Sequence, residues 1–160
     1  FKEIYIMSRV ARSARVASRQ RVETITASKT ITQAESGEYY LINYDSAATI
    51  TITLPSVQDG TYFKFLFIAA LTDNSAAVAF TAQAGEYLNG GPLAMTGDGA
   101  DPGTQVVGNG SSHVTLTIDG NTDVLANSWV EFVSDGSEWY ISGYVMIVDS
   151  GTASNSIVFS

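Results

Sequence analysis

Alternation of polar and apolar residues is the feature that most constrains the fold of this chain. In residues 49–54 (TITITL), threonine alternates with isoleucine and leucine, and residues 113–118 (HVTLTI) repeat the pattern. A period of two places every second side chain on the same face of a β-strand, whereas a helix would spread these residues around its surface. We therefore expect strands with one face toward a core and the other toward solvent.

Turn-forming residues divide the rest of the chain into further short segments. Residues 38–45, 61–71 and 77–82 are rich in aromatic, β-branched and other apolar side chains. Such residues favour strands, and the Gly, Pro and Asp residues between them favour turns. Residues 85–110 are rich in glycine and contain two of the three prolines, which predicts a long loop with a short strand at residues 106–107. About eight strands of this kind predict an all-β fold, as a single antiparallel β-sandwich or jelly-roll-like domain over residues 31–160.

A hairpin is expected around residues 135–136, because Asp-Gly is a strong signal for a tight turn between two strands. A two-residue turn at this point predicts that Phe132 pairs with Trp139. It also pairs Val130 with Ile141, so that all four side chains face the core. A three-residue loop with a bulge would shift the pairing by one residue and break this match, so we expect the shorter turn.

Charge divides the chain at residue 30. Residues 1–30 carry seven bases and two acids (7 − 2 = +5), whereas residues 31–160 carry one base and 14 acids (1 − 14 = −13). We expect residues 1–30 to form an extended or partly helical N-terminal arm that docks on an acidic partner, because the arginine fork binds carboxylates bidentately. A solvated tail is the alternative. The arginines expected to make these contacts are Arg9, Arg12, Arg15, Arg19 and Arg21.

The residues of common catalytic sites are missing or isolated. The chain has no Cys, and its only His, His113, lies in an expected strand without a nucleophile motif elsewhere. Residues 119–123 resemble the start of a calcium-binding loop, but Val124 and Val130 stand where a glycine and a bidentate acid are required. We therefore expect a protein that is not an enzyme and has no catalytic residue, metal site or cofactor. The longest apolar run, residues 65–71, also falls far short of the ~20 residues of a membrane span.

Aromatic residues at outward positions are the best candidates for surface contacts. One contiguous apolar patch would mark a protein interface or a sugar-binding platform. The outward threonines of residues 49–53 would also suit ice or a sugar, but threonine is simply a good exposed strand residue and the rows have no fixed period. The candidate contact residues are Tyr39, Tyr44, Trp129, Tyr140 and Tyr144.

Three segments together resemble a known class of proteins. Residues 129–143 (WVEFVSDGSEWYISG) resemble a terminal hairpin common in small virion proteins of tailed bacteriophages. Residues 51–67 (TITLPSVQDGTYFKFLF) resemble a strand, turn and aromatic strand of these proteins, and residues 12–31 resemble the arm before such a domain. The resemblance implies a capsid decoration (cement) protein or a related tail or fibre β-domain. Such proteins are usually homotrimers, and the resemblance carries over no catalytic residue.

This resemblance and the charge pattern lead to a functional expectation. We expect a structural virion protein of a bacteriophage, most simply a decoration protein on the capsid surface, attached by its basic arm and by self-association. Its partners would be the major capsid protein or neighbouring virion subunits, with no membrane, and the acidic body would repel nucleic acid. The alternative is a receptor- or glycan-binding head of a tail or fibre. An internal capsid protein whose arm touches the genome is a third reading.

Overall fold

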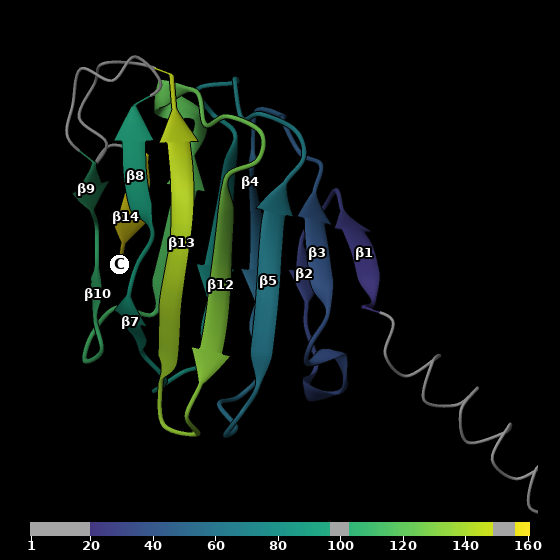
Figure 1. Cartoon of the computed structure of the whole chain (residues 1–160), viewed down its shortest axis with the longest axis vertical. Helices are drawn as coiled ribbons and strands as arrows, with labels where there is room; N and C mark the ends of the chain where they lie inside the picture. Colours follow the sequence, from purple (N-terminus) through teal and green to yellow (C-terminus); the bar gives the residue numbers. More distant parts are fainter. Residues whose placement is uncertain (1–19, 97–102, 149–155) are drawn as a thin grey trace, which may run out of the picture.

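A computed structural model describes residues 20–96, 103–148 and 156–160 of the chain. Its strands form two sheets that lie face to face, with sheet A in front of sheet B in Figure 1. The two helices of the described residues are short 3-10 turns, η1 (Gln33–Glu35) and η2 (Gly120–Thr122). No helix in this described part is long and apolar enough to cross a membrane. The expected all-β fold is confirmed.

The strands follow a fixed order across each sheet. Sheet A has nine strands. Its order is β1 (Val22–Ile25), β3 (Tyr39–Ile42), β5 (Tyr62–Phe67), β12 (Trp129–Ser134), β13 (Trp139–Ile147), β7 (Leu88–Gly90) and β10 (Gly108–Asn109), with β8 (Leu93–Thr96) also beside β13 and β9 (Thr104–Gln105) beside β8. Sheet B has five strands, in the order β14 (Ile157–Phe159), β11 (Thr115–Asp119), β6 (Ala77–Thr81), β4 (Thr49–Thr53) and β2 (Lys29–Thr30).

The first six strands alternate between the two sheets. Strands β1, β3 and β5 are parallel neighbours in sheet A, and β2, β4 and β6 are parallel neighbours in sheet B. The chain therefore winds as a flattened coil, in which each turn adds one strand to each sheet. Strands β12 and β11 then pair antiparallel with β5 and β6 and continue both sheets.

The expected antiparallel pairing is wrong for this coil and for the parallel contacts of β13 with β7 and β8. The alternation in the sequence sets which face of a strand is buried, but it does not set the direction of the neighbouring strand. Parallel neighbours need a crossover connection between them. In the coil, the intervening strand in the opposite sheet supplies that crossover, so no helix is required.

The expected long loop over residues 85–110 is also wrong, because this segment contains the short strands β7, β8, β9 and β10. The short strand expected at residues 106–107 is not formed there, since these residues lie between β9 and β10. The glycines of this segment serve close contacts between backbones rather than conformational freedom. A Cβ atom on Gly91 would lie 2.0 Å from the carbonyl oxygen of Val106, and one on Gly108 would lie 2.4 Å from that of Leu88. The glycine-rich composition predicted a loop, but in the structure glycine permits strands to pack tightly.

The hairpin of β12 and β13 is confirmed, but its register differs from the expected one. Phe132 lies opposite Ile141, so residues 135–138 form a four-residue loop rather than a two-residue turn. The Asp135 carboxylate accepts hydrogen bonds from two backbone N–H groups of this loop, which stabilises the longer form. A shift of two residues keeps every side chain on its original face. Phe132 and Trp139 are therefore fully buried, as expected.

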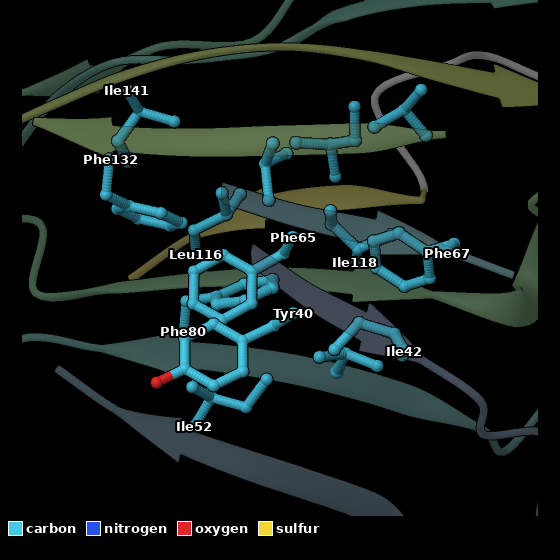
Figure 2. Packing of buried hydrophobic residues seen from close by; sticks show 14 of the residues in the cluster. Tyr40, Ile42, Ile52, Phe65, Phe67, Phe80, Leu116, Ile118, Phe132 and Ile141 are labelled. Carbon is cyan, nitrogen blue, oxygen red and sulfur yellow. The ribbon is translucent and has the colours of Figure 1, made fainter. Parts of the chain in front are cut away.

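Aromatic side chains fill the space between the sheets (Figure 2). The ring centroid of Phe80 in sheet B lies 4.8 Å from that of Phe65 and 5.2 Å from that of Phe132, both in sheet A. Tyr40 stacks on Phe65 at 5.1 Å. Full burial of such a side chain stabilises a fold by about 1.5–3 kcal/mol, so these contacts fix the two sheets against each other.

Residues 22–30 belong to the two sheets, although the charge pattern grouped them with the arm. They form β1 and β2, which pair with β3 and β4. Ile25 and Ile31 are buried on either side of the turn between the sheets. The body therefore includes β1 and β2, which precede the boundary that the charge pattern places between residues 30 and 31.

Candidate functional site

Most of the described carboxylates lie at the ends of strands or in the connections between them. Only Glu23 and Glu131 lie inside a strand, and Asp119 is the last residue of β11. The outer faces of the sheets therefore carry little charge, although the whole chain has a net charge of −8. The other described carboxylates are those of Glu35, Glu38, Asp45, Asp59, Asp73, Glu86, Asp123, Asp135 and Glu138.

A hydrogen-bond network lies at the centre of the outer face of sheet A. The Glu131 carboxylate accepts hydrogen bonds from Ser142 Oγ at 2.7 Å and from the Tyr62 hydroxyl at 3.3 Å. Lys64 Nζ lies 4.0 Å from Glu131 and 4.1 Å from the centroid of the Trp129 ring. Burial and the neighbouring Glu131 raise the pKa of Tyr62, so its hydroxyl stays a donor at neutral pH. We call these five residues the Glu131 network.

An apolar row crosses sheet A through this network. Strand pairing places Leu41 opposite Leu66, and Leu66 opposite Trp129. Trp129 lies opposite Tyr144, and Tyr144 opposite Leu93. All five side chains are partly exposed. Because neighbouring strands are about 4.8 Å apart, a row on five strands spans about 19 Å. We call these five residues the apolar row.

The structure brings together four of the five aromatic residues expected at the surface. Tyr44 does not join them, because it follows the end of β3, packs against the core and donates its hydroxyl hydrogen to the backbone oxygen of Ala48 at 3.0 Å. Past the end of a strand, the period of two no longer sets the direction of a side chain. The four residues on the outer face of sheet A are Tyr39, Trp129, Tyr140 and Tyr144.

Sequence reasoning missed several residues of this face, although a signal for them was present. In residues 62–67 (YFKFLF), a lysine stands between two phenylalanines that are both fully buried. A charged residue between two core residues of one strand must point to the opposite face. This alternation would have placed Tyr62, Lys64 and Leu66 on the outer surface beside Trp129.

The arginine contacts expected of the arm lie mostly outside the described residues. Arg9, Arg12, Arg15 and Arg19 are in the segment that the structure does not describe. Arg21 is described, and its Nη1 lies 2.9 Å from Oε1 of Glu38. Its side chain is 73% exposed, whereas that of Glu38 is 9% exposed. One arginine of the basic segment therefore already pairs with a carboxylate of the acidic body.

Three carboxylates meet beside β1 and β2, where the coil begins. Oxygen atoms of Glu23, Glu35 and Glu38 lie within 4.8 Å of one another, a spacing that would suit a metal ion. However, Lys29 Nζ lies 2.8 Å from Glu23 Oε2 and 2.7 Å from Glu35 Oε1, and Arg21 pairs with Glu38. The cations of the chain occupy the positions that a metal would take, so this cluster is an ion-pair network.

His113 has the environment of a packed side chain. Its Nδ1 accepts a hydrogen bond from the backbone N–H of Asn109 at 3.3 Å, and its ring stacks on Phe159 with the centroids 5.8 Å apart. A general base must instead face the hydroxyl or water that it activates. The described surroundings of His113 therefore give no support to a catalytic role.

Comparisons of the chain with protein-family models, with curated proteins and with solved structures give no match. The outer face of sheet A is the candidate functional site, because it combines an apolar row, exposed aromatic side chains and the single base beyond residue 30.

Proposed function

We propose that this protein is a non-enzymatic structural protein of a bacteriophage virion, a decoration protein attached to the capsid. In this proposal the body is a rigid β-module that associates with other copies. The basic segment before β1 docks on carboxylates of the capsid or of a neighbouring copy. A phage particle is proposed because residues 129–143, 51–67 and 12–31 resemble segments of virion proteins.

The separation of charge is the observation that carries this proposal. The basic segment before β1, residues 1–21 and called the leader below, carries six bases and one acid (6 − 1 = +5), and the carboxylates of the body gather at the ends of its strands. Arginine is well suited to such contacts because its planar fork binds a carboxylate with two hydrogen bonds. The pair formed by Arg21 and Glu38 is an example within the described chain.

Single pairs of this kind are weak. An exposed ion pair contributes about 0–1 kcal/mol, so one leader on one carboxylate would not hold a subunit. Several arginines on each leader, repeated over many copies of a lattice, raise the total through a high effective concentration. The proposal therefore requires assembly and makes the isolated chain a weak binder.

The experiment measures occupancy of the full chain on purified phage particles as the salt concentration rises. We expect occupancy to fall, because salt screens exposed charges beyond ~8–10 Å at physiological ionic strength. A variant with Arg9, Arg12, Arg15 and Arg19 replaced by Ser should be released at low salt, and the matched Arg→Lys variant should bind with intermediate strength. Binding that is independent of salt and survives in the Ser variant contradicts docking by the arginines.

A glycan-binding head is the second candidate, and the exposed aromatic side chains of sheet A favour it. Trp129 and Tyr144 lie opposite each other on neighbouring strands, and aromatic faces commonly stack on sugar rings. However, Lys64 covers Trp129, and Tyr62 and Ser142 donate to Glu131. A glycan array with the wild type and with Trp129→Ala distinguishes the two functions, because only a glycan-binding head gives a signal that the variant loses.

A further inference from the structure

We propose that the outer face of sheet A is the surface through which two copies of this chain associate face to face. This inference rests on the self-association in the proposed function and names the surface that mediates it. Three features of the described residues carry it: the extent of the apolar surface, the placement of charge, and the internal satisfaction of the polar groups on this face.

The apolar surface is broader than one row of residues. Met95 lies opposite Met146 on β8 and β13, next to the pair formed by Leu93 and Tyr144. Leu93 is 38% exposed and Met95 is 37% exposed. With strands about 4.8 Å apart and successive outward residues about 7 Å apart, the surface covers on the order of 300 Å². Exposed patches of this size often mark binding surfaces.

The placement of charge determines which partner can cover this surface. Two acidic bodies repel each other, and contact between their strand ends would bring many carboxylates together. On the outer face of sheet A, Glu131 is balanced by Lys64, the only base beyond residue 30. A second copy can therefore approach this face without placing like charges in contact. A strongly basic or acidic partner would gain little at the centre of this face, because Glu131 and Lys64 offset each other there. Asp135, which accepts a hydrogen bond from the outward-facing Tyr140, lies in the hairpin loop at the end of the face.

The outer face of sheet B is also poor in charge but offers less hydrophobic free energy. Its central row places Thr51 opposite Ala79, and Ala79 opposite Thr117. These small and hydroxyl-bearing side chains expose less apolar area than leucine, methionine and tryptophan. Of these two faces that are poor in charge, the outer face of sheet A is therefore the one that a second copy would cover.

The polar groups of the face favour a protein surface over a sugar. Ser142 and Tyr62 both donate to Glu131, and Lys64 lies over the Trp129 ring. A sugar needs unengaged donors and acceptors to read its hydroxyl groups, whereas an apolar contact between two sheets does not. Because polar groups of the Glu131 network bond to one another, a second copy can cover the network without breaking these hydrogen bonds.

The size of the surface sets the expected strength. An area on the order of 300 Å² per copy is below the ~800 Å² per partner of a stable interface. We therefore expect weak and reversible association of the isolated chain. On a particle, the leader would hold copies near one another and increase the effective concentration of the face.

The test is sedimentation velocity of the full chain over a range of protein and salt concentrations. We expect reversible association that strengthens as salt rises, because salt screens the repulsion between acidic bodies but leaves apolar contacts intact. Contact through the leader has the opposite salt dependence. Association that weakens with salt, or a wild type that stays monomeric at every concentration, overturns the inference.

Two matched variants identify the face. Leu66→Glu places a carboxylate in the centre of the apolar row and should weaken association about tenfold or more. Thr51→Glu adds the same charge to the outer face of sheet B and should leave association near the wild-type value. Circular dichroism and thermal melting report whether each variant folds. If Leu66→Glu does not fold, Leu66→Gln takes its place, because it removes the apolar contact without adding a charge. A folded Leu66 variant that associates like the wild type contradicts the inference.

Particle binding separates the failure of this inference from that of the proposed function. One outcome is that the wild type and Leu66→Glu both occupy particles in a salt-sensitive manner and self-associate equally. This outcome contradicts the assignment of the interface to the outer face of sheet A but supports the decoration function. If the wild type binds no particle but associates through Leu66, the decoration function is contradicted and the interface on the outer face of sheet A is supported.

Discussion

Replacement of Lys29 by methionine should change how the stability of this protein depends on pH. Lys29 Nζ lies 2.8 Å from Glu23, 2.7 Å from Glu35 and 5.4 Å from the centroid of the Tyr40 ring. Methionine keeps the apolar length of the side chain but removes the charge. The carboxylates of Glu23 and Glu35, which lie within 4.8 Å of each other and of Glu38, then lose the cation between them, whereas Arg21 still pairs with Glu38.

The magnitude follows from the degree of burial. Removing one partner of a fully buried ion pair costs about 3–5 kcal/mol. Here the side chains of Lys29, Glu23 and Glu35 are 22%, 44% and 19% exposed, so water screens part of the interaction. We expect Lys29→Met to lower the free energy of unfolding at pH 7 by about 1–2 kcal/mol.

The sign of the pH dependence comes from Glu35. Burial acts to raise the pKa of Glu35, but hydrogen bonds from Lys29 and Thr32 outweigh it and lower the pKa from 4.5 to about 2. A lowered pKa stabilises the fold above pH 4.5, and this contribution is lost as the pH falls toward 2. Without Lys29, its hydrogen bond and charge no longer lower the pKa of Glu35, so this pKa should rise toward 4.5 while the Thr32 hydrogen bonds remain. The stability deficit of the variant relative to the wild type should then shrink as the pH falls from 4.5 toward 2.

Urea unfolding followed by tryptophan fluorescence at a series of pH values measures this difference. Lys64→Met is the matched control, because Lys64 lies 4.0 Å from a single carboxylate and should cost no more than about 1 kcal/mol. In a Glu35→Gln background, Lys29→Met should change the pH dependence of stability little. A Lys29→Met deficit that is the same at pH 7 and near pH 3 would refute the coupling of Lys29 to Glu35.

Three further results are expected. Trp139→Ala should cost about 3–5 kcal/mol in urea unfolding, because Trp139 is fully buried, and Trp129→Ala should cost much less; equal costs would contradict the assigned faces. A chain that lacks residues 1–19 should keep cooperative unfolding and a β-type circular dichroism spectrum, because β1 begins at Val22; an unfolded product would place the leader in the fold. Gly143→Ala should lower the melting temperature, because its Cβ would lie 2.4 Å from the backbone oxygen of Trp129; an unchanged melting temperature would contradict the tight packing there.

The local sequence is enough to predict the strand character of the chain and the face of many side chains. The alternation in residues 49–54 placed Ile50 and Ile52 in the core, where both are buried. The same reasoning assigned Phe132 and Trp139 to the core. These assignments succeed because the period of two is a local property of an extended backbone and needs no knowledge of neighbouring strands. They survived a register shift of two residues because such a shift preserves the face.

The identity of neighbouring strands and the direction in which they run depend on the tertiary fold. Residues 39–42 and 62–67 pair in parallel because residues 49–53 cross to the opposite sheet between them, and alternation carries no trace of that path. The candidate site depends on the same choice. Lys64 reaches Glu131 only because β5 pairs with β12, across more than sixty residues of chain. Contacts of this kind depend on the topology of the whole fold, because the residues that make them are far apart in the sequence.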